Sequence, residues 1–255
     1  MKEEKIVVGD LKINYKTFGE GKPMLVLHGW PSSSDKWQKI GAILASKGFK
    51  IIIPDLPGFG KSQTPPAAWS LDNYVQWVYD FSEAVSGLQN GFILAGHSFG
   101  GAVAAKFAIK YNQKVEKLFL VSAACVREKT ETKSMLARGA KAVKVLSFFP
   151  GYDLFRKAFY KFILKRSDYA YVSGVMKETY LKVISEDLSP KLFFIKAPTT
   201  IIWGDQDDYT PVQQAHLINK KIENSNLVII ENAGHALQIK QPDDLAQKIL
   251  ENLPA

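Results

Sequence analysis

The sequence predicts an α/β fold, in which a mostly parallel central sheet carries helices on both faces. Short apolar runs alternate with segments of helical periodicity through the first half of the chain, and the alternation resumes near its end. Such a pattern is typical of a parallel sheet covered on both sides. Between the two halves lies a stretch of helical character with no convincing strand. We therefore predict a core of residues 1–126 and 191–255 and a helical lid, residues 127–190, inserted between two strands.

The first half of the chain supplies most of the predicted sheet. Its first two strands alternate polar and apolar residues, which indicates a hairpin, and the later strands are continuously apolar, as in a buried sheet. The predicted strands are Lys5–Val8, Lys12–Phe18, Met24–Leu27, Lys50–Asp55, Phe92–Ala95 and Leu118–Val121. The predicted helices are Ser34–Lys47, Leu71–Ser86 and the small-residue stretch from Gly101 to Tyr111.

The last quarter of the chain repeats the alternation. We predict strands at Thr199–Trp203 and Asn226–Ile230, and helices at Val212–Lys220 and Pro242–Leu250. The last helix begins with a proline, at the one helical position where proline is tolerated. Ligand sites in sheets of this kind lie beyond the carboxyl ends of the strands, so the loops after those ends are where functional side chains are expected.

The positive charge of the chain is concentrated in the predicted lid. The net charge is +8, and the stretch from Arg127 to Lys191 contains 14 basic and 7 acidic residues. Within it, Ser134–Phe149 has the pattern of a basic amphipathic helix, which suits an anionic membrane surface. We favour the simpler interpretation, an apolar face on the core and a solvated basic face, over membrane contact. No recognised motif accompanies the charge, so a nucleic-acid partner is not expected.

Composition points to a cytoplasmic protein without metal or cofactor. No window approaches the roughly 18 apolar residues of a membrane span, and the first residues contain no apolar signal region. The one cysteine, Cys125, excludes an internal disulfide and fits a reducing compartment. His and Cys pairs at the spacing of a zinc site do not occur.

The pentapeptide Gly96–Gly100 is the strongest functional signal. It has the form G-x-S-x-G, follows an apolar strand and precedes a helix, which is the context that this pattern requires. Glycines are expected on both sides of Ser98 because a strand that turns directly into a helix leaves no room for side chains. The turn would expose the hydroxyl of Ser98 as a nucleophile.

A serine hydroxyl needs a general base, and the chain has four histidines. His97 is adjacent to Ser98 on the strand, where neighbouring side chains point in opposite directions. His28 belongs to the loop after the third strand, and His216 lies within a predicted helix. His235 follows a late strand through a short turn, so we predict that it is the base.

The base in turn needs a carboxylate that orients it. Asp205, Asp207 and Asp208 follow a strand between Ser98 and His235 in chain order, and one of them is expected to face the imidazole. Two backbone N–H groups are expected to hold the oxyanion. One is that of Phe99, directly after Ser98, and the other is that of Trp30, in the loop after the third strand.

Together these motifs resemble the successive signatures of the α/β-hydrolase fold family. They occur in the same order as in that family: His28-Gly29, Asp55–Ser62, Gly96–Gly100, Gly204–Asp207 and Gly234-His235. The resemblance covers nearly the whole chain outside the predicted lid. It implies that the acid is the last residue of a Gly-x-x-Asp stretch, which is Asp207, with Asp205 and Asp208 as the alternatives.

The sequence lacks features that are typical of several subfamilies, and this reduces the number of subfamilies that it resembles. The nucleophile is a serine and not the aspartate of epoxide hydrolases and haloalkane dehalogenases. The glycine-rich oxyanion loops of hormone-sensitive-lipase-like esterases and of proline iminopeptidases are absent. The resemblance therefore implies a serine hydrolase that cleaves carboxylic esters or lactones of small to medium, largely apolar substrates through an acyl-enzyme. The alternatives are a perhydrolase or haloperoxidase-like enzyme, a carbon–carbon-bond hydrolase, and a receptor-like binding protein of the same fold.

Overall fold

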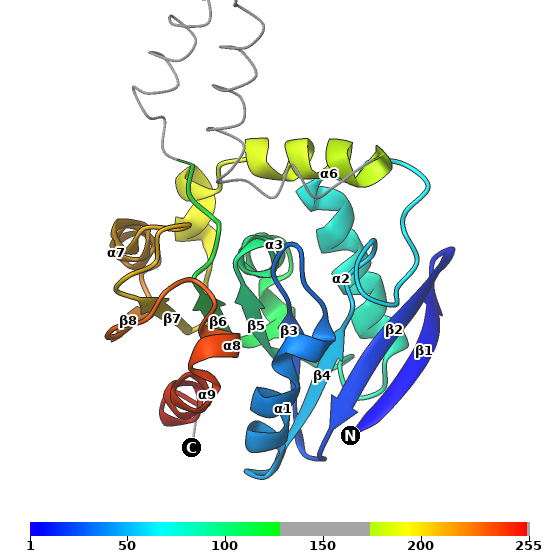
Figure 1. Cartoon of the computed structure of the whole chain (residues 1–255), viewed down its shortest axis with the longest axis horizontal. Coiled ribbons are helices and arrows are strands. Elements are labelled where there is room, and N and C mark those ends of the chain that lie inside the picture. Colours follow the sequence, from blue (N-terminus) through cyan, green and yellow to red (C-terminus); the bar gives the residue numbers. More distant parts are fainter. Residues whose placement is uncertain (128–173, 254–255) are drawn as a thin grey trace, which may run out of the picture.

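The computed structural model describes residues 1–127 and 174–253, and these contain one eight-stranded sheet (Figure 1). The order of the strands across the sheet is β1-β2-β4-β3-β5-β6-β7-β8. The strands are β1 (Lys2–Val8), β2 (Leu11–Phe18), β3 (Lys22–Leu27), β4 (Phe49–Pro54), β5 (Phe92–His97), β6 (Val115–Val121), β7 (Thr199–Gly204) and β8 (Ser225–Ile230).

The sheet is mostly parallel, as the sequence predicts. β1 and β2 form the antiparallel hairpin at one edge, and β2 also pairs antiparallel with β4. Every other neighbouring pair is parallel. The carboxyl ends of β3 and β5 therefore lie side by side, because Leu27 pairs with Gly96. This register brings the loop after His28 next to the turn at Ser98.

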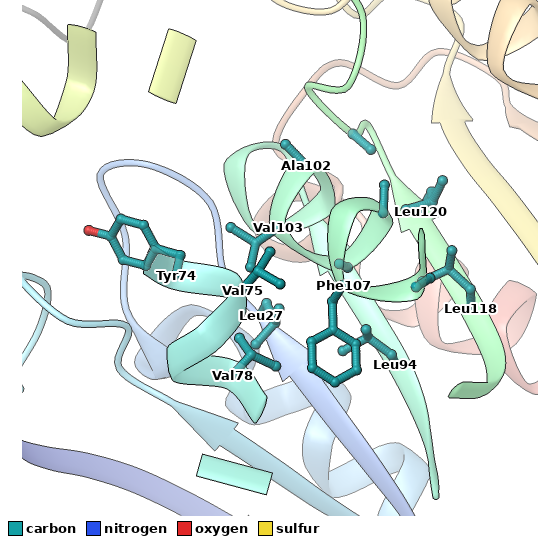
Figure 2. Packing of buried hydrophobic residues seen from close by; sticks show 14 of the residues in the cluster. Leu27, Tyr74, Val75, Val78, Leu94, Ala102, Val103, Phe107, Leu118 and Leu120 are labelled. Atoms are coloured by element: carbon teal, nitrogen blue, oxygen red, sulfur yellow. The ribbon is translucent and has the colours of Figure 1, made fainter. Parts of the chain in front are cut away.

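Helices cover both faces of the sheet. One face packs against α2 (Leu71–Ala84), α3 (Phe99–Lys110) and α7 (Val212–Lys221), and the other packs against α1 (Gln38–Ala45) and α9 (Pro242–Glu251). Alternate residues of a strand serve the two layers: in β5, Leu94 belongs to the first and Ile93 to the second. Figure 2 shows Leu94 of the sheet packed near Phe107 of α3 in the first layer.

Local chemistry explains where several elements differ from the sequence prediction. The predicted helix Ser34–Lys47 is two elements, the 3₁₀ turn η1 (Ser34–Trp37) followed by α1, since Trp37 leaves helical geometry. The helix predicted to end at Ser86 ends at Ala84, because Val85 is extended. Two short elements were not predicted, η2 (Asn112–Lys114) and α8 (Leu237–Lys240).

The described part of the predicted lid is helical. It contains α6 (Gly174–Ser185), and η5 (Ser189–Phe194) spans the predicted boundary with the core. In Figure 1, α6 lies across the top of the molecule over α2 and α3. The predicted helix Ser134–Phe149 and most of the lid's aromatic residues lie outside the described residues. Among the helices that are described, none is long and apolar enough to cross a membrane.

Candidate active site

Ser98 lies at the turn between β5 and α3, in a backbone conformation that residues other than glycine rarely adopt. Its φ is +52° and its ψ is −116°, values that cost free energy in any residue but glycine. Hydrogen bonds hold the turn: the Ser98 amide donates to the Val121 carbonyl at 3.0 Å, and the Ala124 amide donates to the Ser98 carbonyl at 2.9 Å. Strand β6 and the segment that follows it therefore hold Ser98 in this conformation.

The two glycines that flank Ser98 are sterically required. A Cβ on Gly100 would collide with the carbonyl oxygens of Leu27 and His28, and one on Gly96 would collide with the carbonyl of Gly100. These neighbours are backbone atoms of the sheet and of the turn itself, which cannot move aside as a flexible side chain would. The steric reason inferred from the pentapeptide is confirmed.

Asp207 and His235 are joined by a partly buried hydrogen bond. The imidazole Nδ1 of His235 lies 2.8 Å from Oδ2 of Asp207, whose side chain is completely buried, whereas the His235 side chain is 17% exposed. A carboxylate accepts only, so Nδ1 is the protonated nitrogen of the neutral ring. The other nitrogen, Nε2, is left with a lone pair, as a general base requires.

Further donors hold the Asp207 carboxylate in place. Oδ1 accepts from the amides of Tyr209 at 3.0 Å and Thr210 at 2.8 Å, and the Thr210 hydroxyl donates to Oδ2 at 2.9 Å. Burial works to raise the pKa of Asp207, but the hydrogen bond and charge of His235 and the Thr210 amide outweigh it, so the pKa lies below its usual range. The carboxylate is thus ionised at neutral pH.

The other two aspartates of this loop, Asp205 and Asp208, have other surroundings. Asp205 accepts a hydrogen bond from the Ala233 amide at 3.1 Å, which braces the loop before His235. Asp208 is exposed. Of the three alternatives that the sequence left open, the structure brings only Asp207 to the imidazole.

The remaining histidines lie where they cannot serve as the base. His28 is buried, and its Nε2 accepts from the Leu56 amide at 2.9 Å. His216 lies within the predicted helix, which is α7, and its side chain is exposed. His97 is 4% exposed, and burial lowers its pKa to about 3.

His97 has a structural contact that sequence reasoning missed. Its Nε2 lies 2.8 Å from the backbone carbonyl of His235, so the ring donates to that carbonyl and links the turn at Ser98 to the loop of the predicted base. The two rings are 4.9 Å apart between centroids. In the sequence, the position of His97 next to Ser98 argues against His97 as the base. It does not predict the contact with the carbonyl of His235.

Ser98 and His235 line one cavity of about 440 Å³. Its walls come from the loop after β3, the turn at Ser98, the segment after β6, α6, and the loops that follow β7 and β8. Apolar side chains of α6 and α8 form much of the wall, among them Val183, Ile184 and Ile239. Hydrogen bonds hold α6 to the loop before α2, with the Trp69 amide donating to Thr179 at 3.0 Å.

The two predicted oxyanion donors also line this cavity. Phe99 is the first residue of α3, so its N–H has no carbonyl partner one turn earlier in the helix. Trp30 lies in the loop after β3, and its ring packs edge-on against Phe59 and Phe99 and also contacts Tyr180 of α6. Their role as oxyanion donors stays a prediction.

Three further residues of the cavity were not singled out from the sequence: Thr210, Tyr209 and Arg127. Thr210 contacts both Asp207 and His235, and the ring of Tyr209 stacks on that of His235 with centroids 5.2 Å apart. In the sequence, Tyr209 directly follows Asp208, the last of the three candidate acids, and this position is only a weak indication that it belongs to the site. In the ranges 1–127 and 174–253, no group of three His, Cys, Asp or Glu residues is arranged to hold a metal ion.

Comparison with known proteins supports the same family. The model of the alpha/beta hydrolase fold family matches residues 22–144 and 177–242. Lipase 1 of Psychrobacter immobilis is 27% identical over 243 residues, which cover 89% of this chain and 75% of the lipase. The proline iminopeptidase of Saccharolobus solfataricus is 28% identical over 269 residues, with 93% and 86% covered.

A solved structure agrees with this match over almost the whole chain. The crystal structure of a bacterial membrane phospholipase A superimposes with a TM-score of 0.76 at 26% identity, and the match covers 98% of this chain and 84% of the phospholipase. The family match, the eight-stranded sheet and the strained serine at the end of β5 lead to one conclusion. The chain belongs to the alpha/beta hydrolase fold family and is a hydrolase.

Proposed function

We propose that this protein is a serine hydrolase that cleaves carboxylic esters, lactones included, through an acyl-enzyme intermediate. The observation that carries the proposal is the hydrogen bond between His235 and the buried carboxylate of Asp207, beside a cavity that both His235 and the strained Ser98 line. The lipase and phospholipase names of two similar proteins support an ester as the substrate. The iminopeptidase relative makes peptides the alternative that an experiment has to exclude.

Each residue has a defined task in the proposed mechanism. Nε2 of His235 takes the proton of Ser98 as its Oγ attacks the ester carbonyl carbon. Asp207 holds the imidazole in the required tautomer and stabilises the imidazolium that forms. The amides of Trp30 and Phe99 donate to the negatively charged carbonyl oxygen, a kind of contact whose loss typically costs about 10²–10³ in rate.

The intermediate then collapses in two steps. The C–O bond to the alcohol breaks, and His235 returns its proton to the leaving oxygen. A water molecule next gives a proton to His235 and attacks the acyl carbon. The bond between the acyl carbon and Ser98 Oγ then breaks, and His235 passes its proton to Oγ, which releases the acid and restores the hydroxyl. In a lactone the leaving alcohol stays attached to the acyl group, so the product is a hydroxy acid. The apolar wall formed by α6 and α8 suits a largely apolar portion of the substrate.

The test is turnover and covalent labelling of the Ser98→Ala variant. The wild-type protein is expected to react with a fluorophosphonate probe and to hydrolyse 4-nitrophenyl esters in a chain-length series, with lactones and a prolyl arylamide as the other substrate classes. Ser98→Ala should lose both the label and the turnover. Ser32→Ala is the matched control, because Ser32 lines the same cavity, and it should keep the label. Ester turnover that survives in Ser98→Ala would refute the mechanism, and cleavage of the arylamide alone would refute the substrate class.

A further inference from the structure

The charged side chains that the described residues contribute to the cavity wall are all positive. Among the described residues of its wall, the permanently charged side chains are those of Lys36 and Arg127, and no aspartate or glutamate is in the lining. Asp207 is fully buried behind His235. Lys36 is exposed on η1, whereas Arg127 is partly buried between the segment after β6 and α6.

Two backbone carbonyls hold the guanidinium of Arg127 in position. Its Nε donates to the carbonyl of Ile184 near the end of α6 at 2.8 Å, and its Nη1 donates to the carbonyl of Val126 at 3.4 Å. These contacts use two of the five N–H donors of a guanidinium. Ile184 also lines the cavity, so the guanidinium is held at the wall, and no described residue accepts a hydrogen bond from its other three donors.

No carboxylate of the described residues neutralises Arg127 by an ion pair. The two acids nearest to it along α6 and the following turn are occupied by other groups. Glu186 accepts from Lys106 with both oxygens, at 2.7 and 2.9 Å. Asp187 accepts from the backbone amide of Arg127 at 3.1 Å and from the amide and hydroxyl of Ser189. They act on the guanidinium only through their charge.

Within the described residues, Arg127 is a partly buried cation that has no carboxylate ion-pair partner, an arrangement that costs free energy as long as no anion is bound. Burial lowers the pKa of Arg127, yet an arginine keeps its charge at any pH at which proteins fold. A planar guanidinium with free donors is the group that best recognises a carboxylate or a phosphate. The same wall carries Lys36, which would attract an anion from solution.

We propose that Arg127 binds an anionic group of the substrate, so that the preferred substrates are esters that carry a carboxylate or a phosphate. This proposal rests on the proposed function and narrows its substrate class. An acyl chain that ends in a carboxylate would place the anion on the acid side of the ester. A phosphorylated alcohol would place it on the alcohol side. Both sources have the chemistry that Arg127 recognises, and separate substrate pairs distinguish them.

The experiment compares matched neutral and anionic esters. For the acid side the pair is 4-nitrophenyl pentanoate and mono(4-nitrophenyl) glutarate, which differ by a methyl and a carboxylate. For the alcohol side it is 1-butyrylglycerol and its 3-phosphate. We expect the wild type to prefer the anionic member of at least one pair. For that pair, we compare the kcat/KM of the anionic ester with the kcat/KM of the neutral ester. In Arg127→Gln this ratio should fall about 10- to 100-fold, which corresponds to the free energy of a hydrogen bond to a charged group.

Two further variants separate recognition from structure and from overall charge. Lys191→Gln removes the same charge from an exposed residue outside the cavity, and should leave the ratio unchanged. Arg127→Lys keeps the charge without the planar fork, and should keep part of the preference. If the substitution only disturbed packing at Arg127, kcat/KM would fall equally for the neutral and the anionic ester of a pair. Equal losses, or no preference in the wild type for either anionic ester, would overturn the proposal.

Binding without turnover distinguishes this proposal from the proposed function. In Ser98→Ala, thermal shifts with monomethyl glutarate and methyl pentanoate report binding even if no ester is hydrolysed. We expect the glutarate to raise Tm more than the neutral ester does, and Ser98→Ala combined with Arg127→Gln to lose that difference. If the wild type hydrolyses neutral esters, prefers neither anionic ester and shows no such difference, the proposed recognition by Arg127 fails while the proposed function stands. If no ester is hydrolysed and the difference is present, the proposed chemistry fails and the anion site stands.

Discussion

Replacing Asp207 by asparagine tests the proposed acid with little change in shape. The carboxylate accepts from His235 Nδ1, from the Thr210 hydroxyl and from the amides of Tyr209 and Thr210. Asparagine keeps one oxygen, which serves the two amides when it occupies the place of Oδ1. The place of Oδ2 then receives an NH₂ group, which donates where the carboxylate accepted. The fold should therefore survive, while the imidazole loses the negatively charged acceptor of its Nδ1 proton.

The expected loss follows from two effects on His235. A hydrogen bond to a buried charged group is worth about 1.5–3 kcal/mol, which corresponds to roughly 10- to 150-fold in rate. The side-chain amide also favours the tautomer with the proton on Nε2, which removes the lone pair that Ser98 needs; in a serine protease, the same substitution lowers kcat by about 10⁴. We expect kcat for a 4-nitrophenyl ester to fall by about 10² to 10⁴, with KM little changed.

The assay measures kcat and KM for Asp207→Asn beside two controls from the same loop. Asp208→Asn changes an exposed carboxylate and should keep wild-type kcat. Asp205→Asn keeps an oxygen for the Ala233 amide and should lose no more than a few-fold. Circular dichroism and urea unfolding establish that each variant is folded. If folded Asp207→Asn keeps wild-type kcat, or if Asp205→Asn or Asp208→Asn loses as much, the assignment of the acid is wrong.

The remaining predictions concern stability. Burial lowers the pKa of His28 to about 4 and that of His97 to about 3, so between about pH 4 and 6.5 the unfolded chain binds protons that the folded protein does not. The free energy of unfolding should fall with decreasing pH in this window by up to about 1.4 kcal/mol per pH unit for each histidine. Urea unfolding at pH 5, 6 and 7 measures it; stability that is constant over this range contradicts the prediction. Lys106→Met should cost about 1–3 kcal/mol in unfolding free energy at pH 7, because Glu186 then loses both hydrogen bonds while it is partly shielded from water. Unchanged urea unfolding would show that this ion pair contributes nothing.

The sequence by itself determined the layered fold and the order of its functional loops. Apolar strands alternating with helices can be buried only in a sheet that is covered on both faces, so the pattern specified the architecture. The glycines around Ser98 and the loops that end at Asp207 and His235 all follow strands, which placed them at one edge of that sheet. Element ends were less predictable: α2 stops two residues early because Val85 is extended, and this depends on its packing.

Tertiary structure decided which side chains meet. Asp205, Asp207 and Asp208 are chemically alike, and only the fold of their loop turns one of them toward His235. The bond from His97 to the His235 carbonyl joins residues 138 positions apart, so no local pattern encodes it. Glu186 accepts from Lys106, 80 positions away, and within the described residues no carboxylate forms an ion pair with Arg127. Periodicity reports which face of an element is buried, whereas pairing across loops depends on distances that exist only after the sheet has formed.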